Sequence, residues 1–397
     1  MSRRLLVSCF PGHGHLNPLL PVALACRAAG WEVLVTTGPD MAEIAVRHGL
    51  AAVATGLSLA DAERAFLDAH PEVGALSPAD RVRTVLPGMF VDVAARSRVD
   101  ELSALVARWR PDLVLHDVLE FAAPLAALAN GVPHLAHGVG IITPAAEWFG
   151  ALEPVLVRLY AERGVDEGLA RLQATTYLDL CPPSLHTTAV SPFAAVRPVR
   201  PIAASAGALP DVLVDLPHER TVHVTLGTVV NTTPGLLESL VEGAGREPVN
   251  VVVTVGPDRD PGGLLPQPPN VLVERYVPHA ALLPRCSAVV AHAGAGTLLA
   301  TLAAGLPSVL VPVGSEQVLN AELATGAGTA LTVPPSAATA DRVREALHAV
   351  LHDPAFRTRA WAVSREIAAM PAPADVLHEL DRVAGRQAAP ERETARI

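Results

Sequence analysis

The chain has 397 residues, half of them hydrophobic but only 4% aromatic, and its formal net charge is −10. This length favours two domains, and the acidic balance without a cluster of basic residues argues against a nucleic-acid partner. All 30 lysine or arginine positions hold arginine, so the chain lacks the lysine that a Schiff base or a P-loop requires. An aliphatic core of this kind is typical of parallel sheets covered by helices.

The cysteines and the apolar runs indicate the compartment. Cys9, Cys26, Cys181 and Cys286 are far apart and form no CxxC pair, which argues against a disulfide framework or a zinc site. No uncharged apolar run approaches the roughly 18–20 residues of a membrane span, and no signal-peptide cleavage site follows the first residues. We therefore expect a cytoplasmic protein without a membrane partner.

The first half alternates strand and helix patterns. RRLLVSCF predicts a buried strand, and Asn17-Pro18 predicts the start of a helix, with asparagine as N-cap and proline at the first helical position. WEVLVTTG, DLVLHD and VPHLAHG are further strand patterns, and helical patterns such as EFAAPLAALANG separate them. This alternation predicts a doubly wound parallel sheet.

Two irregular apolar segments interrupt this half. They contribute five candidates for an acceptor pocket: Met89, Phe90, Ile142, Trp148 and Phe149. Such residues form either ordinary core beneath long loops or the wall of a pocket for a hydrophobic substrate, since loops on this scaffold carry recognition. Both interpretations stay open.

A second strand–helix series follows a stretch rich in proline and alanine. Its strand patterns are TVHVTLGT, VNVVVTVG, NVLVERYV, SAVVAHAG and SVLVPVG. We predict an N-terminal domain over residues 1–200, a linker over 201–216 and a C-terminal domain over 217–374. In the last segment, 375–397, we expect a helix that packs back onto the first domain and then a loose tail.

The sharpest signal is HAGAGT, residues 292–297, between a strand and a helix that Gly305 closes. Small residues there leave the first helix amides unobstructed, and these amides bind anions because they lack partners at the positive end of the helix dipole. His292 and Thr297 can donate to the same phosphate oxygens. Glu316-Gln317 after the next strand makes the pattern more restrictive than a glycine pair alone.

A dinucleotide fold is the alternative, because its GxGxxG turn is followed after about 20 residues by an acidic residue. However, Leu299 and Asn17 stand where the third glycine of each half belongs. A nicotinamide-dependent oxidoreductase is therefore the weaker interpretation.

The pair His13 and His15, in FPGHGHLNPLLP, lies between the first strand and its helix. Histidine accepts a proton near neutral pH, and a carboxylate on its other nitrogen orients the ring. Asp117 ends a strand, so it should reach the same carboxyl edge of the sheet. A structural role in the turn is the ordinary alternative for these histidines, and His116 is expected to be a core residue.

Two motifs contain residue types that can bind a metal ion. His13-Gly14-His15 lacks a nearby third ligand, which argues against zinc. Asp258-Arg259-Asp260 has the DxD form that can bind a divalent cation, but it lies in a turn-rich loop and is expected to be solvated. We expect no metal.

These motifs resemble those of the inverting nucleotide-sugar glycosyltransferases of GT-B fold that modify natural products. The resemblance covers essentially the whole chain, and its most specific element runs from His292 to Ala321. It implies an α/β GT-B architecture, with two Rossmann-like doubly wound domains facing each other across a cleft. The first domain would bind the acceptor and the second the donor, without a metal. His15 would be the base, Asp117 its partner and His13 the alternative base.

The resemblance also implies the donor site. The nucleoside and diphosphate would be held by Gly227, Thr228, Tyr276, Val277, His279, His292, Gly294, Ala295, Gly296 and Thr297. The sugar would be held by Gly314, Ser315, Glu316 and Gln317. Two departures stand out: Glu316 replaces the usual aspartate, and Ala300 replaces a glutamate that grips the ribose diol in many members. Since deoxyribose has no 2′-hydroxyl, Ala300 favours a dTDP-sugar over a UDP-sugar.

We therefore expect a glycosyltransferase that needs no cofactor beyond its nucleotide-sugar co-substrate. Its acceptor would be a small hydrophobic natural product, either polyketide- or macrolide-like or aromatic. A non-catalytic GT-B partner protein is a further alternative, and a homodimer stays open. The sequence does not specify the sugar, the aglycone or the type of glycosidic bond.

Overall fold

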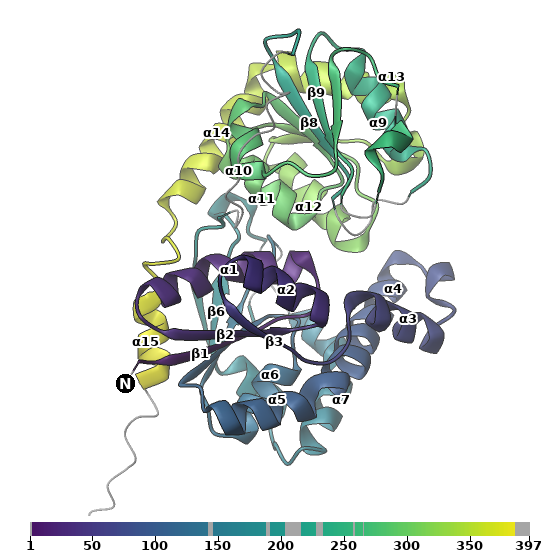
Figure 1. Cartoon of the computed structure of the whole chain (residues 1–397). Helices are drawn as coiled ribbons and strands as arrows, with labels where there is room; N and C mark the ends of the chain where they lie inside the picture. Colours follow the sequence, from purple (N-terminus) through teal and green to yellow (C-terminus); the bar gives the residue numbers. More distant parts are fainter. Residues whose placement is uncertain are drawn as a thin grey trace, which may run out of the picture.

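The structure, a computed structural model, describes residues 2–141, 146–187, 191–202, 216–227, 233–256, 259–264 and 266–385. Ile142, Thr228 and Asp258 lie outside the described residues, as do the side chains of Trp148 and Ser315. Two parallel sheets with flanking helices make up the two halves of the chain (Figure 1). The predicted α/β class with two Rossmann-like domains is confirmed.

The first sheet has seven strands in the order β3-β2-β1-β4-β5-β6-β7. Every pairing between them is parallel. Its strands are β1 (Arg4–Ser8), β2 (Glu32–Thr37), β3 (Ala51–Ala54), β4 (Leu113–Asp117), β5 (His134–His137), β6 (Thr176–Asp179) and β7 (Ala195–Pro198). The strand order reverses between β1 and β4, and in open α/β sheets ligands bind at the carboxyl end of such a switch point.

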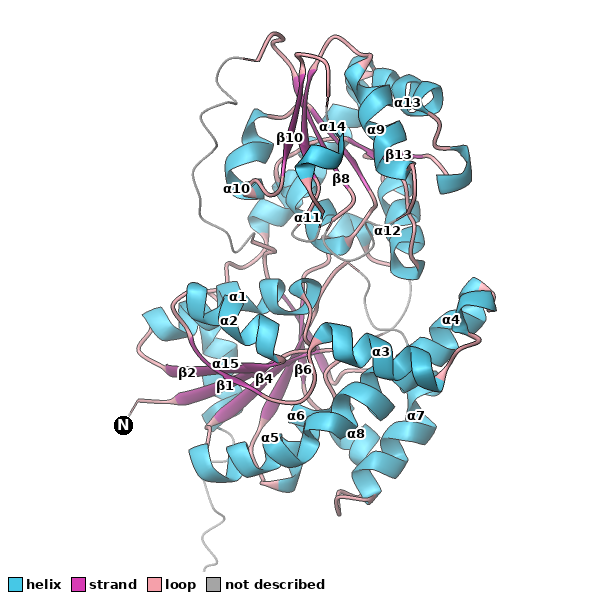
Figure 2. Cartoon of the chain, turned by 45° about the vertical axis from the view of Figure 1, so that its right-hand side comes forward, coloured by secondary structure: helices cyan, strands magenta, loops and turns pink. Residues whose placement is uncertain are grey.

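Helices cover both faces of this sheet. The helices of this half are α1 (His13–Ala28), α2 (Pro39–Arg47), α3 (Leu59–Ala69), α4 (Pro78–Val85), α5 (Arg96–Trp109), α6 (Ala122–Ala129), α7 (Ala146–Ala161) and α8 (Gly168–Gln173), of which α3 and α4 project to the side of the sheet. Figures 1 and 2 show α1 and α2 on one side of the strands and α5 and α6 on the other. Because strand side chains alternate between faces, Leu5 and Val7 of β1 join one hydrophobic cluster and Leu6 joins the other.

The predicted helix start at Asn17-Pro18 is wrong. Helix α1 begins at His13 with Gly12 as its N-cap, and it carries Pro18 and Pro21 inside. The Gly12 carbonyl accepts hydrogen bonds from the His15 and Leu16 amides, each at 3.0 Å, so the first turn closes before Asn17. Pro18 then costs the helix only the bond to the Gly14 carbonyl. As a result, His13 and His15 belong to the first helical turn.

The second sheet has six parallel strands in the order β10-β9-β8-β11-β12-β13. They are β8 (Thr221–Thr225), β9 (Asn250–Thr254), β10 (Val271–Glu274), β11 (Ala288–Ala291), β12 (Ser308–Leu310) and β13 (Ala330–Thr332). Its helices are α9 (Leu236–Gly245), α10 (His279–Leu282), α11 (Ala295–Ala303), α12 (Ser315–Gly326), α13 (Ala340–His352) and α14 (Pro354–Ala369). Here the strand order reverses between β8 and β11.

The short helices are η1 (Val73–Ala75), η3 (Pro183–Leu185), η5 (Pro261–Leu264), η6 (Leu283–Arg285) and η7 (Pro335–Ala337). A π-helical segment, η2 (Leu86–Ala95), connects α4 to α5. Such segments are rare and occur often at functional sites.

The chain returns to the first domain at its end. Figure 1 shows the yellow segment leaving α14 and reaching α15 (Leu377–Gly385) beside the first sheet. Glu379 of α15 accepts a hydrogen bond from the Thr176 hydroxyl of β6 at 2.9 Å, and Asp381 forms an ion pair with Arg3. None of the described helices is long and apolar enough to span a membrane.

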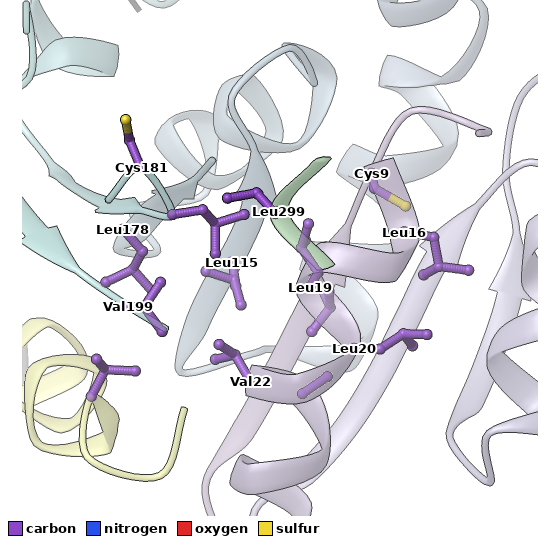
Figure 3. Packing of buried hydrophobic residues seen from close by; sticks show 14 of the residues in the cluster. Cys9, Leu16, Leu19, Leu20, Val22, Leu115, Leu178, Cys181, Val199 and Leu299 are labelled. Carbon is purple, nitrogen blue, oxygen red and sulfur yellow. The ribbon is translucent and has the colours of Figure 1, made fainter. Parts of the chain in front are cut away.

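The two domains share a hydrophobic cluster. Leu298, Leu299 and Leu302 of α11 are buried in the same cluster as Leu16 and Leu19 of α1. Figure 3 shows Leu299 among side chains of the first domain. A Cβ atom added at Gly140, after β5, would lie 2.7 Å from the Ala295 Cβ at the start of α11. The carboxyl end of the first sheet thus meets the candidate donor turn.

Candidate active site

His15 and Asp117 lie together at the switch point of the first sheet. His15 Nδ1 is 3.3 Å from Asp117 Oδ2, without the angle of a full hydrogen bond. Asp117, fully buried at the end of β4, accepts the Phe10 amide on Oδ2 and the Leu119 amide on Oδ1, each at 2.7 Å. Burial raises the pKa of Asp117, but the His15 ring and these amides outweigh that effect and lower it. The carboxylate is therefore held ionised and oriented beside the imidazole.

Two aromatic rings flank His15. The ring of Phe10 lies 4.9 Å from the His15 ring and 4.8 Å from the ring of Phe90, which belongs to the π-helical segment η2. The His15 side chain is 17% exposed, so the nitrogen opposite Asp117 can be reached by a substrate. This surrounding is apolar and suits a hydrophobic acceptor.

The other described acceptor candidates, Met89 and Phe149, lie in two different hydrophobic clusters. Met89, next to Phe90, is buried in a small cluster with Phe10 and Phe66. Phe149 is buried in the core on the α5–α6 side and packs edge-on against Phe193. Phe90 is therefore the described candidate that the structure brings next to His15. His13, the alternative base, lies in the same helical turn and makes an interaction of its own.

A buried ion pair stabilises the segment that leads from β1 into the turn with His13 and His15. Arg98 of α5 and Glu120 lie 3.7 Å apart, and both side chains are 3% exposed. Arg98 donates to the Cys9 carbonyl at 2.7 Å, and Glu120 accepts the amides of Ala122 and Ala123. Burial raises the pKa of Glu120. The pair fixes the segment whose next residue, Phe10, anchors Asp117.

Sequence reasoning missed this pair, because a charged residue on an amphipathic helix is normally solvated. The available signal was the short interval between the strand-end Asp117 and Glu120, directly before a helical pattern. Glutamate at that place can accept the first amides of the helix, as it does at α6.

The candidate donor turn lies at the switch point of the second sheet. Gly294 is the N-cap of α11, and the first amide of the helix to bond within it is that of Leu298, to the Gly294 carbonyl at 2.9 Å. The amides of Ala295, Gly296 and Thr297 remain available at the positive end of the helix. This arrangement suits a diphosphate.

His292 is held between two glycines. A Cβ atom at Gly294 would lie 2.2 Å from His292 Nε2, and one at Gly227 would lie 2.5 Å from His292 Cε1. Gly227 also has a φ of +74°, which only glycine adopts readily. Burial lowers the pKa of His292 to about 4, so the ring is neutral and donates a single N–H at neutral pH. Both glycines are thus required by the position of this ring.

The candidate sugar-binding pair differs in exposure. Gln317 is buried, and its Oε1 accepts the amides of Val313 and Gly314 at 2.9 and 3.0 Å, which caps α12. Its Nε2 makes no hydrogen bond to the described residues. Glu316 is exposed. Gln317 therefore stabilises the start of α12, in addition to any contact with a sugar.

The candidate nucleoside-binding residues follow β10. Tyr276 is 60% exposed, which leaves its ring free for stacking. Val277 is buried in a small cluster against which Ala300 packs. His279 begins α10 and packs edge-on against His223, and burial lowers its pKa. Ala300 itself offers no polar group to a bound nucleoside.

Other polar groups lie away from these two sites. Within the described ranges, no three His, Cys, Asp or Glu side chains are placed to hold a metal ion. The four cysteines are buried and unpaired. His116 lies in the core against His134, as expected. A cavity of about 760 Å³ opens at the opposite, amino end of the second sheet, and its lining includes Arg220, Arg357 and Trp361.

Comparison with known proteins gives a consistent result. The model for the N-terminal domain of erythromycin biosynthesis protein CIII-like proteins matches residues 24–227, and the model for their C-terminal domain matches residues 238–383. L-demethylnoviosyl transferase of Streptomyces niveus is 32% identical over 95% of this chain and 97% of its own length. Elloramycin glycosyltransferase ElmGT of Streptomyces olivaceus is 34% identical over 96% of this chain and 98% of its own length.

A solved structure agrees with these matches. The glycosyltransferase SsfS6 of Streptomyces sp. SF2575, complexed with thymidine diphosphate, superimposes with a TM-score of 0.78 and 28% identity. The match covers 96% of this chain and 99% of that protein.

Proposed function

The chain belongs to the erythromycin biosynthesis protein CIII-like family of GT-B natural-product glycosyltransferases, and we propose that it transfers a deoxysugar from a dTDP-sugar to a hydrophobic acceptor, with inversion and with His15 as base. The chain is thus a glycosyltransferase and not the nicotinamide-dependent oxidoreductase that the glycine pairs also allowed. The observation that carries the proposal is the contact of 3.3 Å between His15 Nδ1 and the buried Asp117 carboxylate.

The base works through the nitrogen that does not face Asp117. The acceptor hydroxyl gives its proton to His15 Nε2, and its oxygen bonds to the anomeric carbon as the bond from that carbon to the diphosphate breaks. Asp117 keeps the N–H on Nδ1 and stabilises the imidazolium that forms. The proton that His15 takes up is then released to solvent.

The leaving group departs toward the second domain. The amides of Ala295, Gly296 and Thr297 donate to the diphosphate oxygens, and neutral His292 adds one N–H. These dipoles are fixed before the reaction, so they stabilise the growing negative charge without reorganisation. Helix dipole and amides thus neutralise the diphosphate without a cation.

Two observations support a dTDP donor. Ala300 packs against the cluster of Val277 and offers no polar group to a ribose 2′-hydroxyl. In addition, the related SsfS6 was crystallised with thymidine diphosphate. A panel of dTDP, UDP and GDP, read as the shift in unfolding temperature, tests this preference, and we expect the largest shift with dTDP. An equal or larger shift with UDP would contradict it.

The base is tested with two histidine variants. His15→Ala should lower kcat at least 10²-fold, which is the usual contribution of a general base. Thymidine diphosphate should bind this variant as it binds the parent, because the donor turn is untouched. His13→Ala serves as the matched control and should retain most of the activity. If His15→Ala turns over normally, or only His13→Ala is inactive, the assignment of the base is wrong.

A further inference from the structure

The donor turn contains a residue in an unfavourable backbone conformation. Ala293, between β11 and α11, has a φ of +64°. Of the other two described residues of this kind, Arg110 ends α5, where left-handed residues are common, and Glu167 is exposed at the start of α8. A side chain with a Cβ atom disfavours this region, and such strain persists only where neighbouring contacts enforce it. A contact must therefore hold Ala293 in place.

Glycine would adopt this conformation freely, but the methyl group has a use. Ala293 is fully buried in the hydrophobic cluster shared by the two domains, where Leu298 and Leu299 also lie. Alanine at this position thus fills the interface at the expense of backbone strain.

The contact comes from the next strand–helix unit. Asn320, fully buried on α12, donates from Nδ2 to the Ala293 carbonyl at 2.9 Å. Its Oδ1 has no hydrogen-bond partner among the described residues. An asparagine buried with half of its amide unsatisfied is costly, which indicates that the bond to Ala293 matters.

The bond orients more than one atom. The Ala293 carbonyl and the Gly294 N–H belong to one planar peptide unit and point in opposite directions. A carbonyl fixed on Asn320 therefore fixes the direction of the Gly294 N–H and the entry into α11. It also fixes the place where Gly294 meets the His292 ring, 2.2 Å from a hypothetical Cβ.

We propose that Asn320 is a positioning residue for donor binding: its amide locks Ala293 in the left-handed conformation and so presents His292 and the first α11 amides to the diphosphate. This inference rests on the proposed function of the turn. Asn320 itself touches no reacting atom. It belongs to the stretch that carries the family resemblance, GSEQVLNA, but no part of the transfer chemistry requires it directly.

Binding of thymidine diphosphate by calorimetry tests the proposal. Asn320→Ala should weaken binding about tenfold, the loss expected for one buried hydrogen bond. The KM for the donor should rise similarly, while the pH profile of kcat stays as in the parent, because His15 is unaffected.

The decisive variant is the double substitution Ala293→Gly with Asn320→Ala. Glycine takes the left-handed conformation without strain, so the double variant should bind thymidine diphosphate within about threefold of the parent. A general packing defect at residue 320 would not be rescued in this way. The double variant also carries the test if Asn320→Ala alone does not fold.

Thr329→Val is the matched control. Thr329 is also fully buried, and its hydroxyl donates to the Ala324 carbonyl of the same helix at 2.9 Å, away from the donor turn. Its loss should leave nucleotide binding unchanged. Parental affinity in Asn320→Ala, or no rescue in the double variant, would overturn the inference alone. A parent chain that binds no nucleoside diphosphate would overturn the proposed function as well.

Discussion

Asp117 contacts the His15 ring with the same oxygen that accepts the Phe10 amide: Oδ2 lies 3.3 Å from His15 Nδ1 and 2.7 Å from the Phe10 nitrogen. Because the other oxygen accepts the Leu119 amide, the carboxylate accepts two amides and also faces the imidazole. The strand end, the first turn of α1 and the candidate base are thus held by one side chain.

Asp117→Asn is expected to impair the chemical step. Asparagine has a single acceptor oxygen, so it cannot satisfy both amides and also accept from His15. We expect kcat to fall about 10²- to 10⁴-fold, as the imidazole loses its orientation and its counter-charge. Steady-state kinetics measure this effect, and the KM for the donor should stay within about twofold. A kcat within fivefold of the parent would mean that His15 needs no carboxylate.

Acidification should destabilise the protein through its buried histidines. Burial lowers the pKa of five imidazoles, those of His116, His134, His137, His223 and His292, to about 4, 3, 4, 3 and 4. Below about pH 6.5 these histidines bind protons in the unfolded chain but not in the folded chain. Their contribution to the free energy of unfolding is therefore fully present above that pH and is lost as the pH falls toward 4. Each imidazole removes about 1.4 kcal/mol per pH unit in that window.

Urea unfolding at pH 7.5, 6.5 and 5.5 measures this slope. His223→Leu provides the comparison, since it removes one of the buried imidazoles from the core of the second domain. Its stability should depend less steeply on pH than that of the parent, by about one proton. A stability that is constant from pH 7.5 to 5.5 would contradict the neutral, buried state of these rings.

Gly294→Ala should weaken donor binding through a steric clash. The added methyl group would lie 2.2 Å from His292 Nε2, so the ring must leave its place beside the turn. We expect thymidine diphosphate to bind at least tenfold more weakly, measured by calorimetry. Gly326→Ala, at the end of α12, has open space around the added methyl group and should bind normally. Equal affinities in the two variants would show that His292 has no role in binding.

Arg98→Met should destabilise the first domain. It leaves the Glu120 carboxylate buried without its counter-charge, which typically costs about 3–5 kcal/mol. In the double variant with Glu120→Gln the buried charge is gone, and part of that loss should be recovered. The exposed pair Arg342–Glu345 supplies the control, because Arg342→Met should cost less than about 1 kcal/mol. Urea unfolding compares the three, and an equal loss in both arginine variants would refute the account.

The proximity of His15 and Asp117 follows from a rule that needs no tertiary information. Parallel strands place their carboxyl ends on one edge, so residues that follow β1 and β4 must approach each other. The same rule brings the loop after β8 to the turn after β11, where Gly227 meets His292. Both sites could therefore be located from strand patterns alone.

The start of α1 could not be predicted in this way. Asn17-Pro18 is a strong local signal, but the Gly12 carbonyl closes the turn earlier, beneath the Asp117–Phe10 contact. Here a contact between distant segments outweighed a local preference. Helix starts are decided by whichever cap the tertiary structure makes available.

Buried polar residues on helices were the main omission. Arg98 and Asn320 lie on α5 and α12, where the sequence gives no reason to expect burial, and only the packing of those helices shows it. For the same reason, the sequence could not distinguish a core position from a pocket position for Met89 and Phe149. Which face of a helix is covered depends on neighbours that are remote in sequence.

The return of the chain through α15 constrains how the protein is made. Glu379 and Asp381 complete the surface of a sheet whose first strand begins at Arg4, so the first half lacks a covering element until the second domain has been translated. Part of the surface of the nascent N-terminal sheet therefore stays uncovered while the whole second domain is translated. A stop codon directly before α15 would therefore damage the half of the molecule that is made first.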